Sequence, residues 1–220
     1  MVTHFYFYIN KFIKFLMNII CNNCVGARLY EVTKQQFPNP FMWMSIDYND
    51  FIKLVENYNT LDLAHPKFVL EKYKENDYKS ILVILNNDIQ LHYIHYILDK
   101  SKKSPVKEKS TNILYKDILS YAKTKWFNRL NRSKEEPLFI YSFNYMPPDY
   151  HIYNMILEKL LNIKNKNLLI LVHEGVKIEK EIPKNIKIEY CKKEIMELNG
   201  GALANALKNI IFKEDVEYNK

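Results

Sequence analysis

Residues 15–30 read FLMNIICNNCVGARLY, and this stretch decides the expected fold. Its first half is apolar and β-branched and stops abruptly at polar residues, which is typical of a short buried strand. Residues 25–32 are helix formers with a single glycine, and either Asn22 or Asn23 can cap the start of that helix. The sequence therefore predicts a strand that passes directly into a helix, with Cys24 at the junction.

Cys24 is a candidate nucleophile because of this position. A thiol at a helix N-terminus lies near the positive end of the helix dipole and near unpaired amide donors, and both favour the thiolate. The same amides could hold the oxyanion that forms when a thiolate attacks a carbonyl. The alternative is a buried cysteine that only packs, and the sequence does not decide between the two.

Composition narrows the classes of function. The chain has 220 residues, and we expect residues 1–220 to form a single α/β domain. Only four glycines occur, and neither glycine-rich nucleotide-binding motif is present. Three scattered cysteines indicate a reducing cytoplasm rather than a disulfide scaffold. A formal net charge of +7 permits an anionic partner such as phosphate, nucleic acid or a lipid surface, but identifies none.

Strands and helices alternate along the chain. Strands are predicted at residues 41–46, 81–85, 89–97, 138–143, 167–172 and 186–190. Helices are predicted at residues 25–32, after Asp47, and at residues 113–130, 150–163 and 202–212. The strands at residues 81–85 and 89–97 are expected to form a hairpin. The strands at residues 138–143 and 167–172 are expected to form a β-α-β unit with the helix between them. The sequence predicts an α/β fold with a three-layer, mostly parallel, Rossmann-like sheet and flanking helices.

Two segments lie outside this alternation. Residues 1–15 could form a lead-in helix with a membrane-facing side, but the apolar run is shorter than the about 20 residues that a membrane span needs. Residues 100–110 are lysine-rich and contain Pro105, which indicates a flexible, solvated basic loop. Because a charge run alone is weak evidence, we do not expect nucleic acid as a partner. We expect a cytoplasmic protein, with peripheral membrane contact as an alternative.

Cys21, Cys24, His92 and His95 allow three interpretations. In a zinc site the histidines would be closer than the usual H-x₃₋₅-H spacing and would point to opposite faces of a strand, so we expect no metal. A redox pair of the C-x-x-C type fits a strand-to-helix turn but requires a functional Cys21. The third interpretation is a nucleophile and its base, Cys24 with either His92 or His95. The sequence assigns no partner to the other histidines, which are His4, His65, His151 and His173.

Two arginines form a further constellation. Arg129 and Arg132 lie about one helical turn apart and could form a two-pronged clamp for phosphate or carboxylate. A surface ion pair with Glu135 or Glu136 is the alternative role for them.

Several of these motifs resemble one known family, in the order in which they occur. The segments are IICNNCVGARLY at residues 19–30, NPF at 39–41, DIQLHYIHY at 88–96, WFNRLNR at 126–132 and PLFI at 137–140. They resemble an uncharacterised domain family of exopolysaccharide biosynthesis proteins from bacterial capsule gene clusters, over about residues 16–172. More distantly, Asn-Cys followed by Pro-Phe-x-Trp resembles papain-like cysteine peptidases, and a capsule acetyltransferase family with an N-terminal Asn-Cys is a looser parallel.

The resemblance implies an enzyme of surface-glycan assembly that performs acyl transfer or hydrolysis through Cys24, with a glycan or a small-molecule acyl donor as its partner. The matching positions are Asn23, Cys24, Pro40, His95, Trp126, Arg129 and Arg132. Asn23, Trp126, Arg129 and Arg132 would bind substrate. The family usually has serine where this chain has Cys21, which argues against the redox and zinc interpretations.

Two alternatives to this enzyme remain. One is a glycosyltransferase-like protein, although no clear D-x-D motif for a metal-held nucleotide sugar occurs. The other is a non-catalytic module that binds an anionic glycan or phosphate. The sequence leaves the cofactor open.

Overall fold

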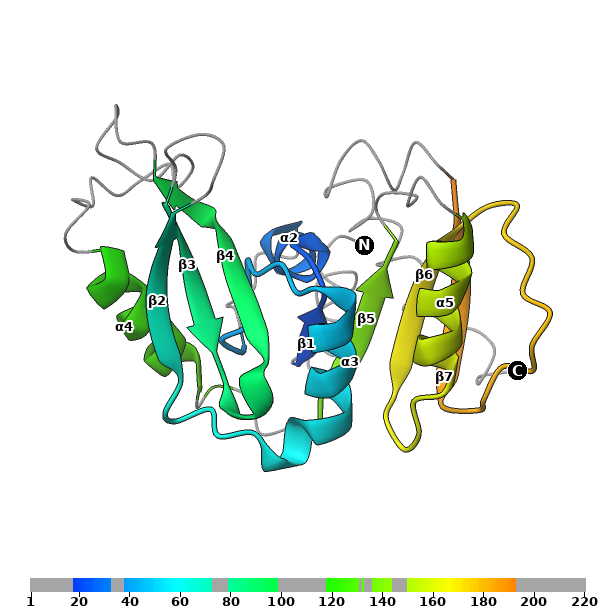
Figure 1. The fold of residues 1–220 in the computed structure, drawn as a ribbon, viewed down its shortest axis with the longest axis horizontal. Helices are drawn as coiled ribbons and strands as arrows, with labels where there is room; N and C mark the ends of the chain where they lie inside the picture. The colour runs from blue at the N-terminus through cyan, green and yellow to red at the C-terminus, as the bar shows by residue number, and fades with distance from the viewer. Residues whose placement is uncertain are drawn as a thin grey trace, which may run out of the picture.

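The computed structural model describes residues 18–32, 38–72, 79–98, 118–130, 132, 136–143 and 150–192. These residues form a four-stranded parallel sheet and a three-stranded antiparallel sheet, which lie side by side (Figure 1). The predicted lead-in helix at residues 1–15, the basic loop at residues 100–110 and the final helix at residues 202–212 lie outside the described residues. None of the described helices has the length and apolar character that crossing a bilayer requires.

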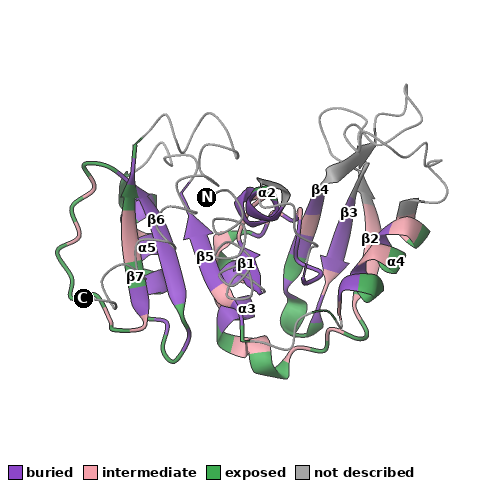
Figure 2. Cartoon of the chain, turned by 180° about the vertical axis from the view of Figure 1, so that it is seen from behind, coloured by how far each residue is buried: buried purple, intermediate pink, exposed green. Residues whose placement is uncertain are grey.

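The parallel sheet has a continuous apolar interior. Its strands, in order across the sheet, are β1 (Ile19–Cys21), β5 (Leu138–Ser142), β6 (Leu168–His173) and β7 (Ile186–Cys191). Every residue of β1 and β6 is buried, and Figure 2 shows the same for most of β5. Parallel strands covered on both faces need such unbroken apolar runs, and this is why the sequence signals for these strands were strong.

Helices cover both faces of the parallel sheet. On one face lie α3 (Tyr48–Asn57) and α5 (Tyr150–Leu161), in front of the sheet in Figure 1. The ring of Phe51 in α3 lies 6.4 Å from that of Phe139 in β5. On the other face lies α2 (Val25–Val32), where a Cβ on Gly26 would be only 3.2 Å from the Cβ of Cys21. Gly26 is therefore the residue that allows α2 to pack directly on β1.

The antiparallel sheet contains β2 (Lys67–Lys72), β3 (Lys79–Ile84) and β4 (Gln90–Leu98), and α4 (Ile118–Leu130) packs on it. β3 and β4 form the predicted hairpin, which Asn87 and Asp88 close with positive φ angles of 63° and 54°. The ring of Phe68 in β2 lies 6.0 Å from that of Trp126 in α4.

The predicted α/β fold with a parallel sheet and a β-α-β unit is confirmed. The expectation of one mostly parallel, Rossmann-like sheet requires correction for two reasons. The hairpin belongs to a separate antiparallel sheet. In addition, the described parallel strands follow one another in chain order across the sheet, whereas a doubly wound fold reverses its strand order.

The strand predicted at residues 41–46 is wrong. This segment forms a turn in which Trp43 has a φ of 66°, and only Ser45 makes an isolated bridge, to His92. Phe41, Met42 and Met44 are buried nevertheless. The apolar pattern that suggested a strand therefore reflects packing between the two sheets and not strand pairing.

Side chains close the outer edge of β1. The N–H of Ile19 donates to the hydroxyl oxygen of Tyr30 at 3.1 Å, and the amide of Asn39 donates to the Ile19 carbonyl at 2.9 Å. The Asn39 amide also donates to the side-chain oxygen of Asn18 at 3.0 Å. These buried groups satisfy the backbone that a further strand would otherwise pair.

Candidate functional site

Cys24 lies at the predicted junction between β1 and α2. The Asn23 side-chain oxygen accepts the N–H of Val25 at 3.0 Å, and the Cys24 carbonyl accepts the N–H of Arg28 at 3.0 Å. Asn23 is thus the capping residue, as one of the two sequence alternatives proposed. The Cys24 side chain is half-buried, so its surroundings are neither the core nor open solvent.

The three cysteines are all free but occupy different environments. Burial raises the pKa of the Cys21 thiol to about 11, although hydrogen bonds within the turn partly offset this effect. The Cys21 thiol donates to the Asn23 side-chain oxygen at 3.3 Å. Burial, and then the carboxylates of Glu189 and Glu174, raise the pKa of Cys191 to about 11. Cys24 is the one cysteine that is not buried.

Asn22 fixes this turn to the neighbouring strand. Its side-chain oxygen accepts the N–H of Ser142 at 2.8 Å, and its amide donates to the Ser142 carbonyl at 3.2 Å. The backbone N–H of Asn22 donates to the Ile140 carbonyl at 3.2 Å. The amide side chain thus extends the β1–β5 ladder beyond the end of β1 and holds the Cys24 turn at the carboxyl edge of the sheet.

The turn at residues 41–46 connects this edge to His92. Ser45 and His92 exchange both backbone hydrogen bonds, at 2.8 and 2.9 Å, which is the arrangement with a Cα separation of about 5.5 Å. The next residue, Ile46, donates its N–H to the Asn22 carbonyl at 2.8 Å. Two short backbone links therefore join the half-buried His92 to the turn that carries Cys24.

His95 lies in a less regular part of the same strand. Ile81 pairs with Tyr93 and Lys79 pairs with Leu98. The two paired positions are therefore two residues apart on β3 but five residues apart on β4, which marks a register shift. The simple alternation predicted for residues 89–97 is therefore interrupted at His95, and alternation alone does not assign its face. The side chain of His95 lies outside the described residues.

Arg28 and Trp43 are site residues that the sequence analysis missed. Arg28 is exposed and lies four residues after Cys24, so both occupy the same side of the start of α2. Its guanidinium lies 5.0 Å from the centre of the half-buried Trp43 ring, which is within the range of a cation–π contact. A spacing of four from Cys24 could have indicated Arg28. Trp43 could not be found this way, because its position depends on a strained turn.

The predicted substrate-binding residues of α4 have three different placements. Trp126 is fully buried, and its ring N–H donates to the Leu63 carbonyl at 2.9 Å. Arg129 is also buried, close enough to Tyr93 to offset part of the increase that burial causes in the pKa of that phenol. Arg132 is exposed beyond the end of the helix. The two arginines therefore do not share one surface.

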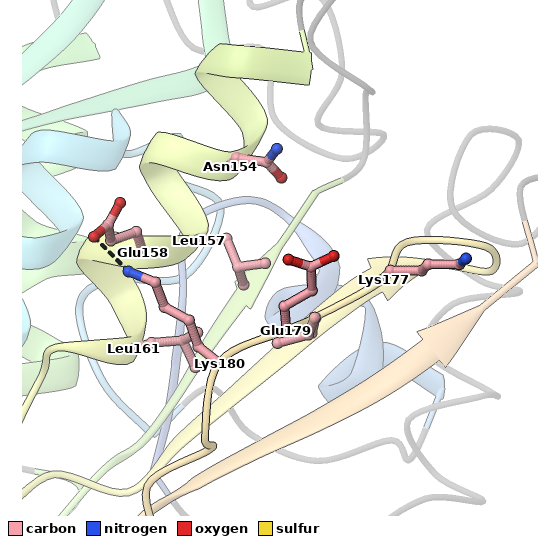
Figure 3. A pocket seen from close by; sticks show the side chains of 8 residues that line it. Asn154, Leu157, Glu158, Leu161, Lys177, Glu179 and Lys180 are labelled. Carbon is pink, nitrogen blue, oxygen red and sulfur yellow. Dashed lines mark hydrogen bonds and ion pairs between the residues drawn. The ribbon is translucent and has the colours of Figure 1, made fainter.

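No group of three or more His, Cys, Asp or Glu residues in the described part of the chain could hold a metal ion. A pocket of about 260 Å³ opens between α5 and the segment that follows β6 (Figure 3). An ion pair between Glu158 and Lys180 borders it. A second pocket, of about 490 Å³, is lined by residues of α3 and α5. Neither pocket contains a predicted site residue.

The fold and this site define an α/β protein with a half-buried thiol at the carboxyl end of a parallel strand. Residues 4–119 match the family described as "Domain of unknown function (DUF1919)", and the protein belongs to this family because the match covers more than half of the chain. The match includes Cys24, Arg28, Trp43, His92 and His95 and ends near the start of α4. No curated protein shows significant similarity to the chain.

Proposed function

We propose that the protein is an enzyme of surface-glycan assembly that uses Cys24 as the nucleophile of an acyl transfer or hydrolysis. The observation that supports this proposal is the environment of the three thiols. Cys24 is half-buried at a helix N-terminus, whereas Cys21 and Cys191 are buried with a pKa of about 11. The role in glycan assembly rests on the ordered motifs that resemble the exopolysaccharide biosynthesis family.

In the proposed reaction the sulfur of Cys24 attacks an acyl carbonyl carbon. A carbon–sulfur bond forms, the bond to the leaving group breaks, and the leaving group takes up the thiol proton through His92 or His95. Water or a substrate hydroxyl then attacks the thioester and releases Cys24. The first turn of α2 supplies backbone N–H groups for the oxyanion, and of these the N–H of Val25 already donates to Asn23.

Arg28 supports a second candidate function. Its exposed guanidinium lies over the Trp43 ring, 5.0 Å from the ring centre, and arginine is a residue type that binds carboxylate and phosphate groups. If Cys24 is not reactive, the same surface would serve a module that binds an anionic glycan or phosphate without chemistry.

A generic acyl donor separates the two functions. Incubation with p-nitrophenyl acetate should release nitrophenolate in a burst and leave one acetyl group on Cys24, which mass spectrometry of peptides locates. Cys24→Ala should lose both the burst and the adduct, whereas Cys21→Ser should keep them. Equal acetylation of the wild type and Cys24→Ala would remove the proposed nucleophile and favour the anion-binding module.

A further inference from the structure

Arg28 and Cys24 share the side of α2 that faces solvent. The Cys24 carbonyl accepts the N–H of Arg28 at 3.0 Å, so the two residues are one helical turn apart, with their Cβ atoms about 5–6 Å from each other. The other residues from Val25 to Tyr30 are all buried. A molecule that reaches the half-buried thiol along this side of α2 therefore meets the exposed side chain of Arg28.

Two independent observations place the Arg28 guanidinium beside the start of α2. Side chains on a helix lean towards its N-terminus, so Arg28 extends over the turn that begins at Cys24. The guanidinium also lies 5.0 Å from the centre of the Trp43 ring. The N–H of Ile46, three residues after Trp43, donates to the Asn22 carbonyl at 2.8 Å. The aromatic ring under the guanidinium thus belongs to a turn that is anchored two residues before the thiol.

Trp43 restricts the positions that the guanidinium can take. The Trp43 ring is half-buried, and its neighbours Met42 and Met44 are buried. The two backbone hydrogen bonds between Ser45 and His92 hold the same turn on β4. An arginine that is already held over an aromatic ring loses less conformational freedom when it binds an anion. Trp43 is therefore a positioning residue for Arg28.

Charge on this side of α2 favours an anion. The guanidinium of Arg28 is always protonated, and the N-terminus of α2 carries a partial positive charge. The first turn of α2 contains no acidic residue. Asp47, which follows the Trp43 turn, accepts the N–H of Asn49 at 2.9 Å as the cap of α3. A substrate that presents its carbonyl carbon to Cys24 would gain binding energy from a negative group about one helical turn away.

We propose that Arg28, positioned by Trp43, makes the Cys24 site selective for acyl substrates that carry a carboxylate or phosphate group. This inference rests on the proposed function, because it names the substrate class of the same nucleophile. The N–H groups of Arg28 donate to the anionic group of the substrate, which keeps its charge while the carbon–sulfur bond forms. Arg28 is thus a substrate contact and takes part in no proton transfer.

Two alkylating reagents that differ in charge test the carboxylate arm. Iodoacetate and iodoacetamide both alkylate the thiolate sulfur with loss of iodide, but only iodoacetate carries a carboxylate. The ratio of their rates at Cys24, measured by peptide mass spectrometry, does not depend on how much thiolate is present. In Arg28→Gln we expect the ratio of the iodoacetate rate to the iodoacetamide rate to fall at least about tenfold.

Three further variants of the full chain sharpen this measurement. Arg28→Lys keeps the charge without the planar guanidinium and should give an intermediate ratio. Trp43→Gly removes the ring and accepts the positive φ at this position, so the chain should still fold, and its ratio should also be intermediate. Lys53→Gln is the control, since Lys53 is exposed on α3 at the opposite face of the parallel sheet, and it should keep the wild-type ratio.

Acetyl phosphate and p-nitrophenyl acetate test the phosphate arm in the same way. Both transfer an acetyl group to Cys24, and Arg28→Gln should slow acetylation by acetyl phosphate at least about tenfold more than acetylation by the neutral ester. A dependence on Arg28 with iodoacetate alone assigns a carboxylate, and one with acetyl phosphate alone assigns a phosphate. Each of these results supports the proposal.

The outcomes separate this inference from the proposed function. If Cys24 reacts rapidly but neither ratio changes in Arg28→Gln, selectivity for anions is overturned and the nucleophile stands. If Cys24 reacts no faster than Cys191 but the ratios still depend on Arg28, the nucleophile fails and the anion contact stands. Wild-type ratios in Trp43→Gly would overturn the positioning role of Trp43.

Discussion

The carboxyl edge of the parallel sheet has a cysteine near each of its two ends, and the two cysteines differ in burial. At the β1 end, Asn22 and Asn23 satisfy the turn with hydrogen bonds, and Cys24 is left half-buried at the start of α2. At the β6–β7 end, His173 is buried beside a buried Cys191, and its ring nitrogens have no hydrogen-bond partner among the described residues. The end of a parallel strand is therefore not enough to make a cysteine accessible. The helix that begins immediately after β1 makes the difference.

The largest expected effect is a difference in thiol reactivity between the two ends. With a pKa of about 11, Cys191 is thiolate in only about one molecule in ten thousand at pH 7, and its burial slows reagents further. We expect iodoacetamide to label Cys24 at least about 100-fold faster than Cys191 in the folded protein at pH 7. Peptide mass spectrometry over time measures both rates in one sample.

Unfolding in urea provides the control for this prediction, because it should bring the two labelling rates within a few fold of each other. Comparable rates in the folded protein would show that the α2 end offers no advantage to its thiol. In that case Cys24 would be a packing residue, and the anion-binding module would be the better proposal.

The second prediction concerns the hydrogen bonds that hold the β1 end. Asn22→Ala removes both side-chain bonds to the Ser142 backbone and leaves a buried N–H and carbonyl with reduced pairing. We expect the free energy of unfolding to fall by about 2–3 kcal/mol, measured by urea denaturation. Asn154→Ala, at an exposed position on α5, is the matched control and should change it by less than about 0.5 kcal/mol. If both variants lowered the free energy of unfolding equally, the two Asn22 side-chain bonds would not be what holds the β1 turn to β5.

The third prediction uses the glycine at each end. Gly175 has a φ of 92° with open space around it, so Gly175→Ala should lose about 1–2 kcal/mol through backbone strain, and Gly175→Asn should lose less. Gly26 is helical, and its added Cβ would press on Cys21. Gly26→Ala should lose about 1 kcal/mol, since helix propensity offsets part of the contact. Stabilisation by Gly26→Ala would mean that α2 can move away from β1 without cost.

The sequence predicted the parts of this site that local patterns control. The strand–helix junction at Cys24, a helix cap at Asn22 or Asn23 and the hairpin depend on neighbouring residues, and all three are confirmed, with Asn23 as the cap. The separate antiparallel sheet was missed because β2 (Lys67–Lys72) has two lysines, a glutamate and only partly buried apolar residues, as a sheet edge does.

Long-range contacts determine the features that local sequence patterns did not indicate. Trp43 joins Arg28 only because a strained turn links the two sheets, and no period in the sequence encodes a φ of 66°. Arg129 and Trp126 carry residue types common in binding sites, but the packing of α4 on β2 buries them.

The smallest expected effect is a pH dependence of stability at the β1 end. Burial raises the pKa of Cys21 from 9.0 to about 11, so the folded state favours the neutral thiol. The resulting stabilisation is complete below about pH 9 and is lost as the pH rises towards 11, because the unfolded chain then ionises first. At pH 9.5 the loss should be about 1 kcal/mol.

Cys21→Ser isolates this effect, because serine does not titrate and its hydroxyl can still donate to Asn23. The difference in the free energy of unfolding between the wild type and Cys21→Ser should shift by about 1 kcal/mol against the wild type between pH 8 and pH 9.5. Lysines and tyrosines titrate in both proteins, so their contributions cancel. Cys191→Ser should show a shift in the same direction, since the pKa of that thiol is raised as well. A difference independent of pH would show that the Cys21 thiol is not held neutral, and the contrast between buried Cys21 and half-buried Cys24 would lose its physical basis.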